Sequence, residues 1–446
     1  MRPRFPILLV CLLLWCCHLA GQPSSGSGTP CVKGYNVTLT GLPATEAGHQ
    51  LYLYGFDGIE VLCLDSATIS KGRLRFKNRK QSIPQGIYVI GGAGGGNVAD
   101  TDCCECNLTS IVIHQDNRFT LDMAGGSSNS EENQMWATYL RLLAGAQSAE
   151  QARTASDQFL SASPNAFVSK YIRVTTAVGG RPVRNEKDYQ ACLEAVDFAD
   201  PRLLHVPPFY LNGLYTYILE PESQSSADCI AKADALLSRC TNPAVRNRHL
   251  RTLFALLDVH NPDYDPVLVH LYDHYDRSWI DEGDARRYKR KTDNLRKIIP
   301  GAEIPELISH DIDGKAHSTL DIKARYTLLW FWDPDCDHCQ EMTPPLHQFY
   351  QEHSRDYGFE VFAVEVNDDF ERWKAFSDKH GLWDWTNLST SRGEANLDFI
   401  EYFDIMTTPV MFLIDNSRNH TIIARQITLD ELRSFLKKQT THHNEK

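Results

Sequence analysis

The amino-acid sequence predicts a multidomain protein: an all-β sandwich or barrel over 31–126, an all-α middle region over 131–298 and an α/β domain over 299–440. Three observations support this order. Turn residues separate short apolar runs in the first region, apolar residues recur at helical spacing in the second, and apolar strands alternate with helical segments in the third. The length of 446 residues also exceeds that of a usual single domain.

The N-terminus predicts a secretory signal peptide over 1–21. Two arginines begin it, and the apolar stretch over 7–15 is too short to span a bilayer. A lipid on Cys16 or Cys17 would add membrane association, although neither cysteine follows a small residue. Export predicts a periplasmic or cell-envelope location, where an oxidising environment lets the ten remaining cysteines pair.

Composition and spacing exclude several classes of function. The formal charge of -12 and the absence of a basic stripe argue against nucleic-acid binding. The basic run over 286–291 reads as an exposed helix face. In the middle region, His270 and His274 stand four residues apart, but no acidic third ligand accompanies them, so no metal site is expected. No cofactor motif was found, because the glycine run over 91–96 lacks phosphate-loop spacing.

A cluster of thiols, Cys103-Cys104-Glu105-Cys106, stands out in the β region. Three thiols and a carboxylate could hold a soft metal ion. In an oxidising compartment, disulfides from this cluster to Cys31 or Cys63 are favoured instead.

The most informative motif is Cys336-Asp337-His338-Cys339, which follows the apolar run over 326–332 and opens a predicted helix. Two cysteines at this spacing can form a redox dithiol, half a zinc site or a structural disulfide. About seventy residues later, Thr408-Pro409 stands just before a second apolar run. This combination is much more specific than the cysteine pair, and it is the layout of a thioredoxin-like active site.

The elements around the motif occur in the order of the thioredoxin fold. A hairpin turns at Asp313-Gly314, and strand, helix, strand, helix, two strands and a helix follow. We expect these elements over 304–315, 326–332, 337–350, 359–366, 369–380, 410–415, 421–424 and 429–437.

Residues 300–438 resemble the TlpA/ResA branch of exported thioredoxin-like thiol-disulfide oxidoreductases. The resemblance rests on the hairpin, on Trp332 close before the cysteines, on Pro344 after them and on Thr408-Pro409. The β and helical regions resemble modules that precede such domains in envelope proteins of Bacteroidetes-like bacteria. The resemblance implies an enzyme that exchanges disulfides of envelope proteins and depends on an upstream redox partner.

The predicted site residues are Cys336, Cys339, His338, Thr408 and Pro409. At a helix start, exposed N–H groups and the helix dipole favour a Cys336 thiolate, and Cys339 lies one turn further along, within reach of the mixed disulfide. A protonated His338 would favour the thiolate as well. In this fold the peptide bond before the proline is normally cis.

The sequence also departs from the family pattern. Trp330 stands where thioredoxin has a buried aspartate, and Met342 stands where the ResA-like branch has a glutamate. Asp333 and Asp335 flank the motif and would oppose thiolate formation. No general base can therefore be named from the sequence.

Three other interpretations stay open. A peroxiredoxin would share much of the fold, but its reactive cysteine requires a threonine three residues earlier, where this chain has Asp333. A binding or assembly protein could carry the dithiol as a secondary feature. In a third interpretation, Cys336 and Cys339 form a static disulfide that never turns over.

Overall fold

The computed structural model describes residues 29–92, 107–177, 183–219, 225–258, 264–405 and 407–444. Its contacts divide the chain into two compact units, with the division between Leu256 and Leu257. The predicted signal peptide, with Cys16 and Cys17, lies outside the described residues, as do the Cys103-Cys104-Glu105-Cys106 cluster and most of the glycine run.

The N-terminal unit begins with strands that form two four-stranded sheets, in the orders β4-β1-β7-β8 and β3-β2-β5-β6. β1 pairs with β4 antiparallel and with β7 parallel. The strands are β1 (Cys31–Thr40), β2 (Gln50–Asp57), β3 (Glu60–Thr68), β4 (Leu74–Pro84), β5 (Gly86–Gly91), β6 (Asn107–Ile113), β7 (Arg118–Asp122) and β8 (Ser127–Ser128).

One hydrophobic core joins the two sheets. Side chains of a strand alternate between its faces, and along β1 the residues Tyr35, Val37 and Leu39 are buried in turn. They share a core cluster with Leu53 of β2 and Ile111 of β6, which belong to the other sheet. The two sheets therefore pack against each other as a sandwich.

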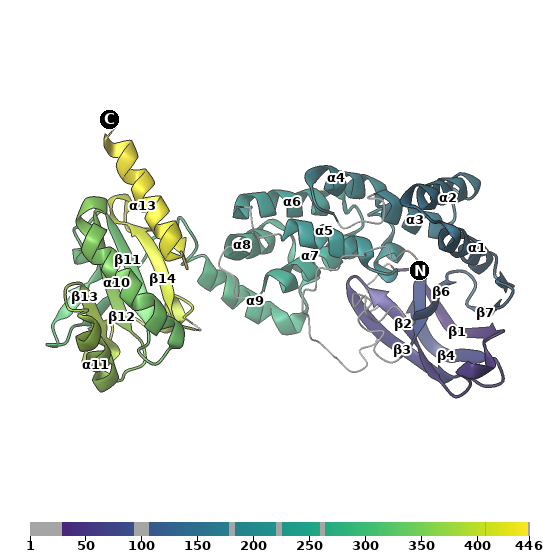
Figure 1. Cartoon of the computed structure of the whole chain (residues 1–446), viewed down its shortest axis with the longest axis horizontal. Coiled ribbons are helices and arrows are strands. Elements are labelled where there is room, and N and C mark those ends of the chain that lie inside the picture. Colours follow the sequence, from purple (N-terminus) through teal and green to yellow (C-terminus); the bar gives the residue numbers. More distant parts are fainter. Residues whose placement is uncertain are drawn as a thin grey trace. The chain divides into compact units, whose positions relative to one another are not determined.

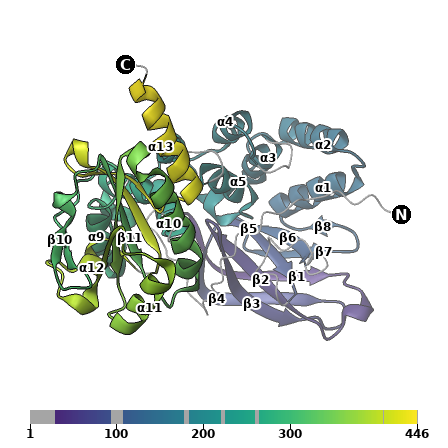
Figure 2. The ribbon, with the colours of Figure 1, turned by 60° about the vertical axis from the view of Figure 1, so that its left-hand side comes forward.

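Helices follow the strands. Serine or asparagine side chains cap several of them, as at Ser130, Ser148 and Asn185, where each accepts a backbone N–H of the first turn. α1 and α2 run side by side (Figure 2). The helices are α1 (Glu131–Gly145), α2 (Ala149–Ala162), α3 (Phe167–Ala177), α4 (Glu186–Ala195), α5 (Phe209–Ile218), α6 (Ser226–Arg239), α7 (Pro243–Leu257), α8 (Asp265–His274) and α9 (Glu282–Leu295).

The division into two units cuts across the predicted helical region over 131–298. α8 and α9 belong to the C-terminal unit, where Asp265 of α8 pairs with Arg425 of a later strand. Both side chains are only 9% exposed. The predicted boundaries near 126 and 298 stay predictions, because contacts alone group the chain differently.

The C-terminal unit contains a seven-stranded sheet in the order β10-β9-β13-β12-β11-β14-β15. β11 lies inside it, parallel to β12 and antiparallel to β14, and every residue of β11 is buried. The elements are β9 (Ile308–His310), β10 (Ala316–Ser318), β11 (Tyr326–Trp332), α10 (Asp337–Tyr357), β12 (Phe359–Glu365), α11 (Phe370–His380), β13 (Thr386–Ser389), α12 (Phe399–Tyr402), β14 (Val410–Asp415), β15 (Thr421–Arg425) and α13 (Leu429–Asn444).

Helices pack on both faces of this sheet. α10 and α13 lie side by side over one face (Figure 1). That face carries Trp330 and Trp332 of β11, which share a core with Cys339 of α10. On the other face, Phe331 stacks on Phe399 of α12 at 5.4 Å between ring centroids. The central strand is thus covered on both sides, and its end leads directly into the predicted motif.

The fold of this unit confirms the predicted order, with three differences. α10 extends to Tyr357 rather than ending near 350, although Pro344 and Pro345 each remove a helix N–H donor. The hairpin turn lies at Asp313-Gly314, but its strands are shorter than expected. β13 and α12 were not expected. Within the described residues, no helix is long and apolar enough to cross a membrane.

Candidate active site

A tight turn delivers the chain from β11 to the start of α10. The N–H of Asp335 donates to Oδ1 of Asp333 at 2.8 Å, and the N–H of Cys336 donates to the Asp333 carbonyl at 3.2 Å. Cys336 occupies the N-cap of α10, with no side chain capping the helix there. The free N–H groups of the first turn therefore face the Cys336 sulfur.

The loop before β14 comes to the same point from 72 residues away. The Cys336 thiol donates a hydrogen bond to the Thr408 carbonyl, with 3.2 Å between sulfur and oxygen. The Thr408–Pro409 peptide bond is cis. The structure thus brings Cys336 and Cys339 together with Thr408 and Pro409, which lie far along the sequence from the two cysteines.

The two sulfurs of the motif lie in different environments. Burial acts to raise the pKa of Cys336, but the Thr408 side chain, the Cys339 thiol and the N–H groups of Cys339 and His338 outweigh it, so the pKa is lowered. Cys339 is fully buried, and burial raises its pKa to about 12. The geometry therefore favours ionisation of Cys336 over ionisation of Cys339, which keeps its proton at neutral pH.

The charges beside the motif compensate one another in part. Asp335, which the sequence suggested would oppose the thiolate, forms an ion pair with Arg372 of α11. Arg372 also lies 3.4 Å from Asp369. His338 is exposed on the first turn of α10.

The positions that hold an acid in related patterns are apolar here. Trp330 is fully buried in the core, and Met342 packs against that core. A fully buried glutamate, Glu365, instead ends the neighbouring strand β12. Sequence reasoning missed it because it placed this residue inside an ordinary apolar strand. Side-chain alternation along the strand could have found it, since Val361, Ala363 and Glu365 point to the same face of the sheet.

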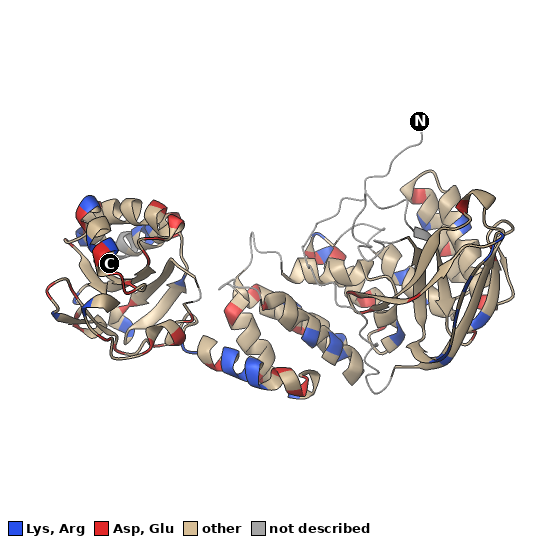
Figure 3. Cartoon of the chain, turned by 90° about the horizontal axis from the view of Figure 1, so that it is seen from below, with Lys and Arg blue, Asp and Glu red and all other residues tan. Residues whose placement is uncertain are grey.

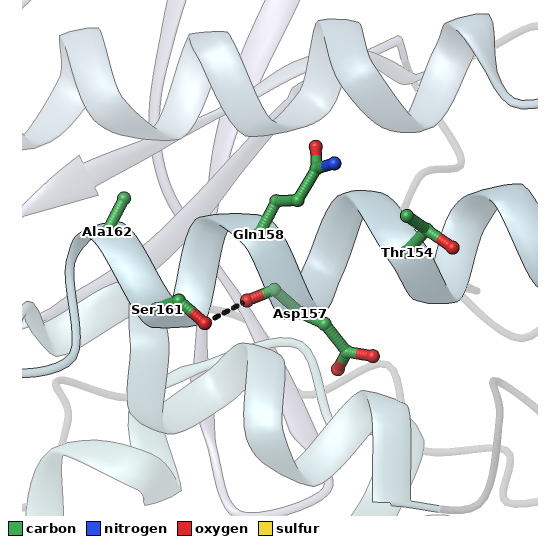
Figure 4. A pocket seen from close by; sticks show the side chains of 5 residues that line it. All are labelled: Thr154, Asp157, Gln158, Ser161 and Ala162. Atoms are coloured by element: carbon green, nitrogen blue, oxygen red, sulfur yellow. Dashed lines mark hydrogen bonds between the residues drawn. The ribbon is translucent and has the colours of Figure 1, made fainter.

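Other candidate sites gain no support among the described residues. No group of three or more His, Cys, Asp or Glu side chains is placed to hold a metal ion there. His270 and His274 instead stack on each other at 4.0 Å. A shallow hollow on α2 is lined by residues of that helix alone, including Asp157 and Ser161 (Figure 4). Ser161 bonds the Asp157 carbonyl at 2.8 Å, as a solvated helix face would.

Basic residues of the described chain are dispersed among acidic ones (Figure 3). The predicted basic run lies on α9, and much of its charge is paired. Arg287 and Lys291 both contact Asp258, and Lys289 contacts Asp293 at 2.6 Å. This pairing agrees with an exposed helix face rather than a surface that neutralises phosphates.

The thioredoxin-like family matches residues 324–420, a segment that contains the motif and the cis proline. The chain is 27% identical over 146 residues to the thiol-disulfide oxidoreductase ResA of Bacillus thuringiensis. The aligned segment covers 32% of this chain and 80% of the relative. The ResA of Geobacillus thermodenitrificans is 24% identical over 140 residues, covering 31% of this chain and 77% of the relative.

Solved structures also align with this part of the chain. One is a domain of a possible thiol-disulfide isomerase from Cytophaga hutchinsonii, 32% identical, with a TM-score of 0.30; the match covers 33% of this chain and 98% of that one. Another is the thioredoxin domain of a thiol-disulfide oxidoreductase from Bacteroides vulgatus, which is 24% identical with a TM-score of 0.28. That match covers 32% of this chain and 99% of the domain.

Proposed function

We propose, from the premise that this chain belongs through its C-terminal region to the thioredoxin-like family, that it is a thiol-disulfide oxidoreductase acting through Cys336 and Cys339. One observation carries the proposal. The two sulfurs of one motif have pKa values shifted in opposite directions, and the lower value belongs to the cysteine at the helix start. This difference suits exchange chemistry, because the thiolate is the attacking species and Cys336 is the sulfur that ionises first.

The reaction transfers two electrons from the dithiol to a substrate disulfide. The Cys336 thiolate attacks one substrate sulfur, the substrate S–S bond breaks, and the other substrate sulfur leaves and takes a proton from water. Cys339 then loses its proton and attacks the Cys336 sulfur. A Cys336–Cys339 disulfide forms and the second substrate sulfur leaves as a thiol. The same steps in reverse oxidise a substrate dithiol.

The loop at Thr408 and Pro409 would hold the substrate beside Cys336. The Thr408 carbonyl already accepts a hydrogen bond from the reactive thiol. A proline has no N–H to pair with a neighbouring strand, which leaves the adjoining backbone open to an extended substrate segment. Protein disulfides fit this arrangement better than small disulfides, because an extended peptide can form several backbone hydrogen bonds.

The wider setting follows from the sequence. The predicted signal peptide places the protein in the periplasm or cell envelope, with envelope proteins as substrates and an upstream dithiol donor that restores the reduced form. We assign partner selection, rather than chemistry, to the predicted modules over 31–126 and 131–298. No metal or cofactor is required by the steps above.

The test compares two serine variants of the full-length protein in the reduction of insulin disulfides. Cys336→Ser should abolish the reaction, because it removes the attacking sulfur. Cys339→Ser should accumulate mixed disulfides with substrates, because the first step proceeds and the second cannot. Gel shifts under non-reducing conditions measure the trapped species.

Two results would contradict the proposal. Trapping by Cys336→Ser but not by Cys339→Ser would reverse the assigned roles. Insulin reduction that survives Cys336→Ser would remove the dithiol from the chemistry and favour a binding or assembly protein.

A further inference from the structure

One face of the N-terminal sandwich carries a row of exposed cations. The residues of β4 alternate between the core and solvent, so Leu74 and Phe76 are buried while Arg75 and Lys77 point outward. Arg79 continues the exposed series. In the sequence these cations are interleaved with apolar residues, and for that reason no basic stripe was evident there.

Strand pairing brings a further cation to the same face. β1 lies between β4 and β7, and its Asn36 is paired with Lys77 on one side and with Arg118 on the other. Arg118 is exposed. Nε of Arg75 donates to Oδ1 of Asn36 at 2.8 Å, so cations surround an uncharged side chain. Below, the basic face means Arg75, Lys77, Arg79 and Arg118.

The charges of the basic face lack carboxylate partners. Within the described residues, no ion pair joins any of its four side chains to an acid. Of the carboxylates beside β7, Asp116 is exposed and Asp122 accepts a loop N–H at 2.9 Å. The pKa of Lys77 is lowered, first by Arg79 and then by Arg75, as like charges do. This face is therefore an exception to the mixing of charges elsewhere in the described chain.

The chemistry of the basic face favours a membrane over other anionic partners. Protein interfaces have aromatic and other apolar side chains at their centre, whereas β1 and β7 present Thr38 and Thr120 beside the cations. Proteins that bind single-stranded nucleic acids stack the bases on aromatic side chains, and predicted export removes the chain from nucleic acids. An anionic membrane attracts clustered Lys and Arg without apolar contact.

We propose that the basic face docks this protein on an anionic membrane surface, where its four side chains contact the phosphate groups of lipid headgroups. Arginine pairs with a phosphate through two N–H groups, and lysine acts as a point charge. The chain as a whole carries a formal charge of -12, so the same surface repels its other faces and turns this one toward the lipid. This docking is independent of the dithiol chemistry.

The experiment measures co-sedimentation of the full-length protein with lipid vesicles. One set of vesicles contains phosphatidylglycerol and phosphatidylcholine in equal amounts, and the other contains phosphatidylcholine alone. The wild-type protein should bind the anionic set more tightly and should be released by salt, because about 1 M salt shortens the screening length to about 3 Å. A signal peptide or a lipid anchor would act on both sets and is thereby separated from the basic face.

The basic-face variant combines Arg75→Gln, Lys77→Gln, Arg79→Gln and Arg118→Gln. Each cation near an anionic membrane contributes roughly fivefold to the affinity, so this variant should bind several hundredfold more weakly. The milder pair Lys77→Gln and Arg118→Gln keeps the hydrogen bond from Arg75 to Asn36. That pair should bind roughly 25-fold more weakly. Circular dichroism checks that both variants fold.

The matched control removes the same amount of positive charge from α9, by Arg286→Gln, Arg287→Gln, Lys289→Gln and Arg290→Gln. These four residues are exposed as well, but their helix also carries acids, and two of them form ion pairs. This variant should bind the anionic vesicles almost as tightly as the wild-type protein, because its charges are balanced locally.

Three results would overturn this inference. The wild-type protein could bind both sets of vesicles equally, or the α9 variant could lose as much affinity as the basic-face variant, which would leave only an effect of net charge. A wild-type protein that ignores the vesicles but binds polyglutamate or an oligonucleotide through these cations would assign the face to another partner. Insulin reduction without vesicles tests the proposed function separately, and the basic-face variant should keep the wild-type rate.

Discussion

Cysteines of the two units lie in contrasting environments. Cys192, Cys229 and Cys240 are buried in the N-terminal unit, and burial raises their pKa values to about 12, 11 and 12. Cys336 lies at a helix start and is half-buried, and hydrogen bonds lower its pKa. The difference predicts that the reactivity of a thiol depends on nearby N–H groups and on access from solvent, not on the number of thiols in a region.

Cys339 adds a further distinction. It is as buried as the helical cysteines, and its pKa is raised to about 12, yet it stands one turn from Cys336. A buried thiol can therefore take part in exchange when a neighbouring sulfur brings the electrophile to it. Cys192, Cys229 and Cys240, by contrast, come from separate places in the sequence, and none of them belongs to a C-x-x-C motif.

The largest expected effect separates these two groups by activity. Alanine at Cys192, Cys229 and Cys240 together should leave insulin reduction at the wild-type rate, whereas Cys336→Ser alone should abolish it. The triple variant should lose stability, at roughly 1 kcal/mol for each truncated core side chain. Urea unfolding measures that loss. A triple variant that folds but cannot reduce insulin would contradict the claim that these three thiols take no part in the reaction.

The second prediction concerns stability in base. For a thiol whose folded pKa exceeds the unfolded value of about 8.5, the unfolded state releases its proton first, so stability falls as pH rises above that value. Each helical thiol should contribute a loss of about 1.4 kcal/mol per pH unit. The triple alanine variant should therefore lose less stability between pH 8.5 and 10 than the wild-type protein does. If the free energy of unfolding, measured with urea, fell equally steeply with pH in both proteins, the buried environment of these thiols would be contradicted.

The third prediction concerns the redox potential. The backbone N–H of His338 favours the Cys336 thiolate, and a protonated imidazole at this position would favour it further, and thus the reduced form. The potential should therefore lie above about -270 mV, the value for thioredoxin. His338→Pro removes both groups and should lower the potential most, while His338→Ala keeps the N–H and should lower it less. Equilibration with glutathione measures all three proteins. A wild-type value at or below that of thioredoxin, unmoved by either substitution, would exclude this role for His338.

The smallest expected effect is that of Thr408→Val. The Thr408 side chain lowers the pKa of Cys336, so its loss should shift the pH dependence of the first exchange step slightly upward. The backbone carbonyl that accepts the thiol hydrogen bond remains in this variant. Stopped-flow rates across pH measure the shift, and a downward shift would contradict the assigned contact.

The sequence predicted those elements that a short run of neighbouring residues is enough to identify. The apolar strand over 326–332, the cysteines after it and Thr408-Pro409 each carry a clear local signal, and these formed the site. β13 was missed because Thr386–Ser389 has a single strongly apolar residue, and α12 because Phe399–Tyr402 is only four residues long. The ion pair of Asp265 with Arg425 was also missed, because 160 residues separate the partners.

Glu365 marks the limit of sequence reasoning at the site. Its complete burial depends on which face of β12 it occupies and on the pairing of β12 with β11, and neither follows from spacing alone. Related proteins carry an acidic residue at the positions of Trp330 and Met342, so these two positions showed only that the usual acid is missing. The position of Glu365 beside Trp332 became visible once the strands were paired.

The most direct test of the central claim measures the alkylation of each cysteine in the reduced full-length protein as a function of pH. Isotope-labelled iodoacetamide and peptide mass spectrometry assign a rate to every site. Cys336 should reach half of its maximal rate at a pH below the value of about 8.5 for free cysteine, while Cys339, Cys192, Cys229 and Cys240 stay unmodified until the protein unfolds. A Cys336 rate that follows free cysteine, or a Cys339 that reacts first, would contradict the account.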